Sequence, residues 1–220
     1  MVIMEIKITR KKIKNIIIKV NEKGEVLVSA PYKVPNSYIE NLLQEKKEWI
    51  REKIEQVKNK QEKISTFEEG DEFIYLGKKY TIKIKISSVE YCELTEEHFI
   101  LNIKINNFEN RKKIISKWLT DNFCTLVKNR TIEFGKRIGY LPSIIKFRDM
   151  KTRWGSCNTL TRSITFNLQL YKKPLEVIDY VILHELAHIP YPHHQKEFWN
   201  FVEKYMPDWK KRRDLLKTSS

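Results

Sequence analysis

The stretch Val181–Trp199 reads VILHELAHIPYPHHQKEFW, and it holds four of the five histidines of the 220-residue chain. His184 and His188 are four residues apart, so on a helix they lie on one face with their Cβ atoms about 5–6 Å apart. Two imidazoles placed in this way can bind one metal ion. Glu185, rotated by about 100° around the helix axis, can hydrogen-bond to a water on that ion without ligating it. This is the HExxH arrangement of zinc hydrolases, and it predicts Glu185 as the catalytic residue.

A catalytic zinc site needs a third protein ligand, and the residues after His188 offer two candidates. Pro190 lacks an N–H and is expected to end the helix at about His188 or Ile189, so that the chain reverses. His194, on the first turn of the next helix, is then expected to return to the metal. His193 is the rival third ligand, and the spacing favours His194.

The first hundred residues predict strands interrupted by one helix. β-branched runs on either side of Asn21–Gly24 indicate a hairpin, and residues 72–86 and 98–105 read as further strands. Ser37–Glu40 has the form of a capping box. The helix that follows it is predicted from an apolar stripe of Ile39, Leu42, Leu43, Ile50, Ile54 and Val57.

The second half begins with helical spacing. Apolar residues recur every three or four positions from Phe108 to Gly139, which is expected to end a long helix. Strands are predicted between residues 144 and 170, and Pro174 can begin the helix that carries the histidines. We therefore predict an α+β protein with an antiparallel β-rich region over residues 1–106. Residues 107–220 are predicted to form a second domain, in which a sheet packs on the HExxH helix.

The composition limits the environment and the partners. The net charge of +14 gives a positive surface, but no nucleic-acid motif accompanies it, so we expect weak, salt-sensitive and non-specific binding to DNA or RNA. Three cysteines without a CxxC pair argue against a disulfide framework and favour a cytoplasmic location. No stretch approaches the roughly 18 apolar residues of a membrane span, so no membrane partner is expected.

Further segments give the chain a resemblance to a known family. They are LGKKY (76–80), MKTRWGSCN (150–158), EVIDYVILHELAH (176–188), PHHQKEFW (192–199) and YMPDWKKRR (205–213). In this order they resemble the YgjP-like predicted metal-dependent hydrolases, which are related to the WLM and SprT-like zinc metallopeptidases. The resemblance implies a zincin-like C-terminal domain, with Glu185 as the catalytic residue. It also implies a zinc ion bound by His184, His188 and His194.

Two more residues are candidates for contacts with a substrate or an oxyanion. Arg153, in the segment TRWGSC, is expected on a strand next to the metal, where its guanidinium can bind a carboxylate, a phosphate or an oxyanion. Tyr191 follows the second ligand in a tight turn, where its hydroxyl can donate to the same oxyanion. Trp154 is interpreted as a packing residue and Gly155 as a backbone requirement.

Three functions remain open from the sequence. The favoured one is zinc-dependent peptide hydrolysis, with a zinc-activated water and Glu185 as the general base. Hydrolysis of a nucleotide or another phosphoanhydride is the first alternative, because the positive charge suits a small anionic substrate. A basic nucleic-acid-binding protein with a structural zinc is the second, disfavoured because structural sites are usually closed by four protein ligands. The sequence assigns neither a physiological substrate nor an oligomeric state.

Overall fold

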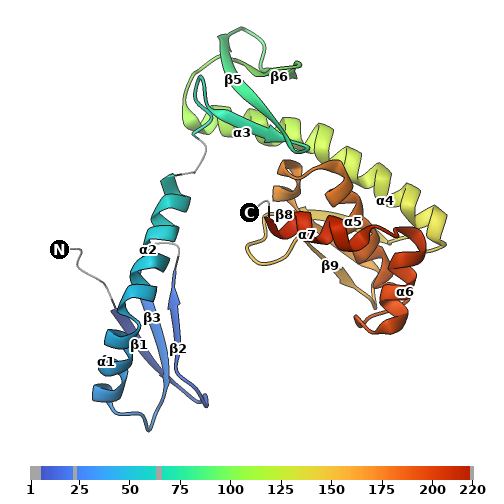
Figure 1. Ribbon diagram of the computed structural model, residues 1–220. Helices are drawn as coiled ribbons and strands as arrows, with labels where there is room; N and C mark the ends of the chain where they lie inside the picture. The colour runs from blue at the N-terminus through green and yellow to red at the C-terminus, as the bar shows by residue number, and fades with distance from the viewer. Residues whose placement is uncertain (1–5, 22–23, 63–65, 219–220) are drawn as a thin grey trace. The chain divides into compact units, whose positions relative to one another are not determined.

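The structure is a computed structural model that describes residues 6–21, 24–62 and 66–218, and the chain forms two compact units, 1–65 and 66–220 (Figure 1). In the first unit, the strands are β1 (Ile6–Lys11), β2 (Ile17–Val20) and β3 (Val26–Pro31), in the order β1-β3-β2. The helices are α1 (Asn36–Glu45) and α2 (Lys47–Glu62). They enclose a small apolar core of Val26, Val28, Ala30, Ile39, Leu43, Ile50 and Ile54.

Of the local predictions for this unit, the hairpin is confirmed and the capping box is wrong. The hairpin is confirmed, because β2 pairs antiparallel with β3, although residues 22 and 23 of its turn lie outside the described residues. The capping box at Ser37–Glu40 is wrong: α1 begins at Asn36, and its N-cap is Pro35, without a capping side chain. The prediction of a single helix is wrong, because the chain forms α1 and α2, which are separated at Lys46. Four of the stripe residues lie in the core, whereas the side chain of Val57 lies outside the described part.

The second unit contains two sheets and the remaining helices. One sheet contains β4 (Glu72–Tyr75), β5 (Lys78–Ile86), β6 (Tyr91–Leu94) and β7 (His98–Ile103). Its strands are arranged in the order β4-β5-β7-β6. The other sheet contains β8 (Ile144–Arg148), β9 (Gly155–Asn158) and β10 (Ser163–Asn167), arranged in the order β8-β10-β9. The helices are α3 (Phe108–Leu119), α4 (Thr125–Ile138), α5 (Leu175–Ala187), α6 (Lys196–Tyr205) and α7 (Trp209–Thr218).

The predicted mixture of helices and sheets is confirmed, but the antiparallel arrangement of the N-terminal region is wrong in part. β1 runs parallel to β3, and β5 runs parallel to β7. In both sheets the later strand pairs antiparallel with its sequence neighbour and also parallel with an earlier strand. Alternating apolar residues predict that a segment is a strand, but they do not identify its second partner.

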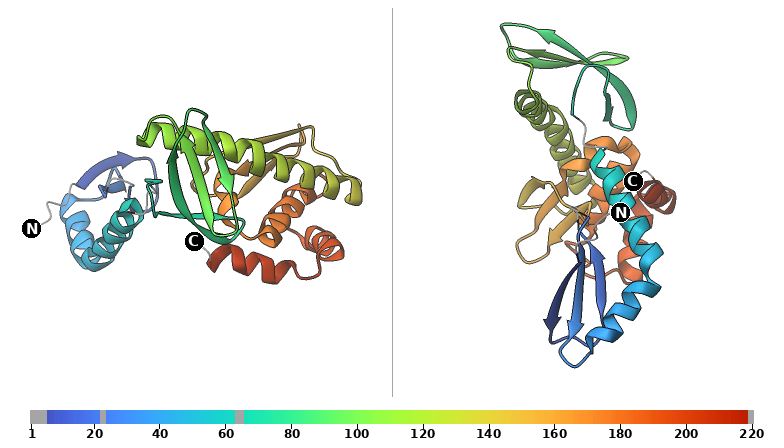
Figure 2. Two further views of the ribbon diagram at one scale, coloured as in Figure 1. Left: turned by 90° about the horizontal axis from the view of Figure 1, so that it is seen from above. Right: turned by 90° about the vertical axis from the view of Figure 1, so that its left-hand side faces the viewer.

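Helices α3 and α4 form one continuous rod (Figure 1, and Figure 2 on the left). They are joined by a π-helical turn at Thr120–Cys124, which buries Phe123 and Cys124. The Thr120 hydroxyl donates to the Ser116 carbonyl and the Asn122 amide donates to the Trp118 carbonyl, both at 2.9 Å. These side chains satisfy carbonyls in the widened turn. Gly139 ends the rod in a left-handed conformation at φ 81°, as predicted.

The core of the second unit is built around α5. Ten of its residues are buried, so this helix is apolar on nearly every side. The four-stranded sheet and α3 belong to the same hydrophobic cluster, which includes Phe73, Phe99, Ile114 and Ile115. The domain boundary predicted at residues 106–107 therefore falls inside the second unit.

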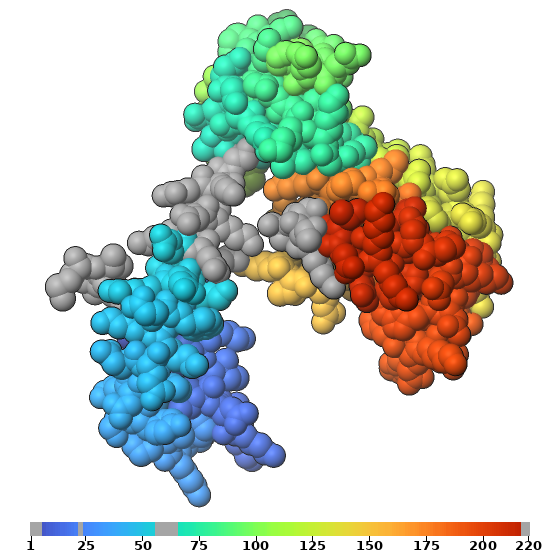
Figure 3. All heavy atoms as spheres, in the orientation of Figure 1, coloured from blue at the N-terminus to red at the C-terminus, as the bar shows by residue number. Residues whose placement is uncertain are grey.

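Helices α6 and α7 lie at the surface of the second unit, where they form one continuous face (Figure 3). Trp199 of α6 stacks on Trp209 of α7 with ring centroids 4.2 Å apart, which holds the two helices together. None of the helices in the described part of the chain combines the length and the apolar character needed to cross a bilayer.

Candidate active site

Three of the clustered histidines reach one point from the end of α5 and the loop that follows it. His184 lies in the last turn of α5, and His188 is the residue at which the helix ends. The chain then turns, with the Tyr191 N–H donating to the Ala187 carbonyl at 3.0 Å. His194 returns from the loop, two residues before α6 begins at Lys196, and not from the first turn of that helix as predicted.

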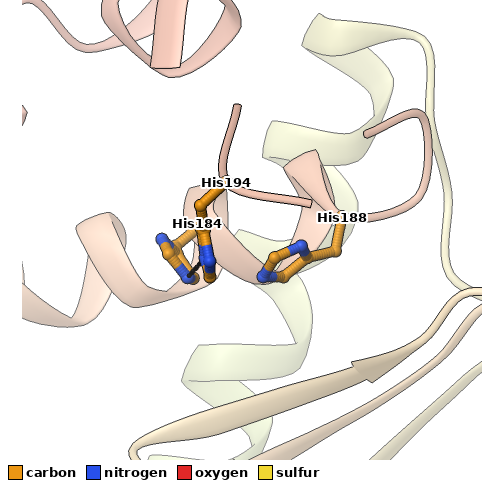
Figure 4. Close-up of side chains that lie close together, drawn as sticks. All are labelled: His184, His188 and His194. Carbon is orange, nitrogen blue, oxygen red and sulfur yellow. Dashed lines mark hydrogen bonds between the residues drawn. The ribbon is translucent and has the colours of Figure 1, made fainter. Parts of the chain in front are cut away.

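The three imidazoles face one another closely enough for a metal ion (Figure 4). One ring nitrogen from each lies within 4.8 Å of the others. Nε2 of His194 and Nε2 of His184 are 3.0 Å apart. Two nitrogens at about 2.0–2.1 Å from a tetrahedral zinc lie roughly 3.3 Å apart, so this spacing fits shared coordination. His193, the rival third ligand, is not part of this group.

The protonation of the cluster also fits a metal. Nδ1 of His188 donates to the Tyr191 carbonyl at 3.3 Å, which fixes the tautomer that leaves Nε2 free to ligate. Burial, together with the neighbouring His188 and His194, lowers the pKa of His184 to about 3. Burial likewise lowers the pKa of His188. Neutral imidazoles are the form that binds metal, so these two ligands need not lose a proton at neutral pH.

Glu185 lies beside the cluster in a confined position. The residue is 5% exposed, and its carboxylate accepts no hydrogen bond from the described residues. Burial raises the pKa of Glu185 to about 8, and the positive charge of Arg153 opposes this shift. A carboxyl group with a pKa near neutrality can both accept and release a proton, as a general base must do.

Gly155, the first residue of β9, determines where the Glu185 side chain can lie. A Cβ on residue 155 would be 2.6 Å from both Cγ and Oε1 of Glu185, which is closer than two such atoms can approach. The interpretation of this glycine as a backbone requirement therefore gains a specific reason: the strand passes directly against the carboxylate.

We expect Gly155→Ala to lower hydrolysis by up to about 10²-fold, because the new methyl group displaces the Glu185 carboxylate by about an ångström. Metal content should stay near that of the wild type, since the three atoms nearest to this methyl group all belong to Glu185 and not to a histidine. Ser156→Ala is the matched control on the same strand. Equal activity of the two variants, measured with metal bound, would contradict this role for Gly155.

A pocket of about 270 Å³ opens beside Glu185 and His184. The segment between β8 and β9 contributes Thr152, Arg153 and Trp154 to its walls, and β9 contributes Gly155. The remaining wall comes from α5 and α7, through Tyr180, Val181, His184, Glu185 and Leu216. The structure thus brings the predicted Arg153 to the pocket, on the segment before the strand, together with Trp154.

Tyr191 does not line this pocket. Its ring packs against Phe201, with centroids 5.3 Å apart, and its carbonyl binds His188. Tyr180, which was not among the candidates from the sequence, lines the pocket instead, and burial raises its pKa to about 12, so its phenol keeps its proton at neutral pH. Its position four residues before His184, on the same helix face, was the signal that could have identified it.

Aromatic rings of α6 pack against the imidazole of His194. Trp199 stacks on His194 with centroids 5.6 Å apart and on Trp209 with centroids 4.2 Å apart. The guanidinium of Arg213 lies over the Trp209 ring at 4.9 Å. The loop that carries His194 is therefore supported by α6 and α7, although His194 itself is exposed.

The helix that carries the first two histidines is braced by an ion pair. Asp179 of α5 accepts two hydrogen bonds from Arg130 of α4, at 2.5 and 2.6 Å. The two side chains are 10% and 27% exposed. Such a bidentate pair fixes the position of one helix along the other.

We expect Asp179→Asn to lower the free energy of unfolding of the second unit by about 3 kcal/mol, because it leaves the Arg130 guanidinium partly buried without its charge partner. Urea unfolding measures this loss. The control is Glu72→Gln, which breaks an ion pair at the surface: the side chains of Glu72 and Lys79 are 50% and 71% exposed. This change should lower the free energy of unfolding by less than about 1 kcal/mol. A similar loss in both variants would show that the brace adds nothing beyond a surface pair.

The chain matches a known protein family over most of its length. A family model described as "YgjP-like, metallopeptidase domain" matches residues 14–219. No curated protein matches. The crystal structure of the metallopeptidase zymogen of Pyrococcus abyssi abylysin is 24% identical, and the match covers 42% of this chain and 93% of that chain at a TM-score of 0.40. The metallopeptidase zymogen of Methanocaldococcus jannaschii jannalysin is 22% identical, covering 42% and 95% at a TM-score of 0.39.

Proposed function

The chain belongs to the YgjP-like metallopeptidase family, and from this premise we propose that it is a zinc-dependent peptidase whose general base is Glu185. His184, His188 and His194 would hold the ion. The observation that carries the proposal is the convergence of these three imidazoles beside a buried carboxylate that no other described group binds. Three protein ligands leave a position open, as in catalytic zinc sites and unlike most structural ones.

Each residue has a separate task in this proposal. Bound zinc would supply Lewis acidity, which polarises a carbonyl group and brings the pKa of water toward 7. Glu185 takes the proton from the attacking water and delivers it to the leaving nitrogen. The apolar surroundings that raise the pKa of Glu185 make this carboxylate a stronger base than an exposed one. Tyr180 keeps its phenolic proton and can donate it to the carbonyl oxygen as negative charge develops there.

The strand β9 offers a place for the peptide backbone. β9 pairs with β10 on one side and is an edge strand among the described residues, and its first residue touches Glu185. An extended peptide that adds to this edge would pass the carboxylate at the end of the strand. Recognition of this kind depends on backbone hydrogen bonds more than on side chains, so it suits an unfolded polypeptide.

The proposal is tested with the zinc-loaded protein and two substrate sets, an unfolded polypeptide and a panel of nucleoside triphosphates. We expect cleavage of the polypeptide that a chelator abolishes and zinc restores. Zinc-dependent turnover of a triphosphate, without cleavage of the polypeptide, would replace the proposed peptidase by a phosphoanhydride hydrolase.

A further inference from the structure

The pocket beside Glu185 contains a guanidinium group that forms no hydrogen bond or ion pair with the described residues. This group belongs to Arg153, which lines the pocket and is exposed. Many other arginines of the second unit do bind a partner, for example Arg111, Arg130 and Arg212. A guanidinium has five donors in a fixed plane, so Arg153 is available to a planar anion.

The backbone under this side chain is held in place by one buried residue. Asn167, which is 4% exposed, donates from Nδ2 to the carbonyls of Arg153 and Met150 at 2.8 and 2.6 Å. Its Oδ1 accepts from the Met150 N–H at 3.3 Å, and its own N–H donates to the Trp154 carbonyl at 2.9 Å. These bonds fix the segment that carries Arg153, so less conformational freedom is lost when a ligand binds.

The walls around the guanidinium favour a short peptide segment. Trp154, Tyr180, Val181 and Leu216 supply apolar and aromatic surface, and a pocket of about 270 Å³ is smaller than a typical site for a drug-sized ligand. The pocket is therefore suited to the end of a peptide or to one side chain.

The charges within the pocket favour a carboxylate over a phosphate. Among the described residues that line the pocket, Arg153 is the one guanidinium or ammonium group, and Glu185 brings a carboxyl group to the same space. A phosphate group would place nearly two negative charges against this single cation and beside that carboxyl group. A carboxylate carries one charge, and its two oxygens match the guanidinium in a bidentate pair.

We propose that this pocket is a carboxylate subsite, in which Arg153 binds either the C-terminal carboxylate or an Asp or Glu side chain of the peptide substrate, close to the bond that is cleaved. The inference rests on the proposed peptidase function and narrows its substrate class. It separates Arg153 from the proton transfers assigned to Glu185: the guanidinium selects the substrate, and the carboxylate of Glu185 reacts.

The test compares peptides of one sequence that differ in their carboxylates. One has a free C-terminus, a second is amidated, a third is amidated and carries Glu next to the cleaved bond, and a fourth is amidated with Gln in that place. For the zinc-loaded wild type, we expect kcat/KM to be about 10- to 100-fold higher for a carboxylate peptide than for its neutral partner, as for a hydrogen-bonded ion pair. Which pair shows the preference identifies the source of the carboxylate.

Two variants assign the preference to Arg153. Arg153→Ala should reduce the ratio of the two kcat/KM values toward one, and Arg153→Lys should keep part of it, because an ammonium group retains the charge but not the bidentate geometry. Arg148→Ala is the matched control, since Arg148 is exposed at the end of β8 and does not line the pocket. A wild type that cleaves all four peptides equally, or an Arg153→Ala variant that keeps the full preference, would overturn the subsite.

A binding measurement keeps this test separate from the peptidase proposal. If the wild type cleaves no peptide at all, the proposed function fails, and the subsite is then judged by calorimetric titration of the zinc-loaded protein with the tripeptide Ala-Ala-Leu and with its amide. Tighter binding of the free acid that Arg153→Ala removes supports a carboxylate subsite. Equal binding of acid and amide, or selective binding of inorganic phosphate over acetate, overturns it.

Discussion

Replacing Glu185 by Gln should lower hydrolysis by about 10²- to 10⁴-fold while zinc stays bound. The amide has the size of the carboxylate, so it fills the same space against Gly155, but it cannot accept the proton of the attacking water. None of the three imidazoles depends on Glu185 for a hydrogen bond that the structure shows, and their arrangement should persist. The measurement combines kcat/KM with the zinc content of the same sample.

A measurement of stability distinguishes the loss of a general base from damage to the fold. In the metal-free protein, burial raises the pKa of Glu185 from its usual 4.5 to about 8, so the folded state holds this proton to a higher pH than the unfolded state. The free energy of unfolding therefore falls as the pH rises between these values. Glu185→Gln removes this loss and should be at least as stable as the wild type at pH 8. A variant that keeps zinc and wild-type turnover would refute Glu185 as the base.

Replacing His194 by Ala should weaken zinc binding by more than about 10²-fold, because the loss of a ligand exceeds the 10- to 100-fold cost of losing a residue that only supports one. His194 is exposed and lies in a loop, so its removal should leave the fold of the second unit intact. Competition with a chelator of known affinity measures the change, and circular dichroism checks the fold.

His193→Ala is the control for the third ligand. It removes the neighbouring imidazole from the same exposed loop without touching the cluster. We expect its zinc affinity to equal that of the wild type. If the His193 variant loses zinc and the His194 variant keeps it, His193 and not His194 is the third ligand. Full zinc affinity in both variants would show that the metal does not bind at this site.

The elements that could be predicted from the sequence are those with a strong local signal. Gly139 ends the α3–α4 rod because glycine tolerates the left-handed conformation found there. Pro190 lacks the N–H that would continue a helix, and α5 ends just before it, at Ala187. Ser37 shows the limit of such signals, because the capping pattern is present but α1 begins one residue earlier.

Pairings between distant segments could not be predicted in this way. β7 pairs antiparallel with β6 and also parallel with β5, and the alternating pattern of a strand does not specify this second partner. The same holds for the site. The spacing of His184 and His188 follows from one helix, whereas the contact of Gly155 with Glu185 joins a strand and a helix thirty positions apart.

The π-helical turn at Thr120–Cys124 is the place in the rod where one extra residue is accommodated. Such a turn holds one residue more than an α-helical turn, and each residue turns a helix by about 100°. Deleting one residue there would let the turn close as an ordinary α-helical turn, so α4 would keep its orientation about the rod axis and Val127 and Thr131 would stay buried. Elsewhere in α3 or α4, the same deletion would turn every later residue of the rod by about 100° relative to the core.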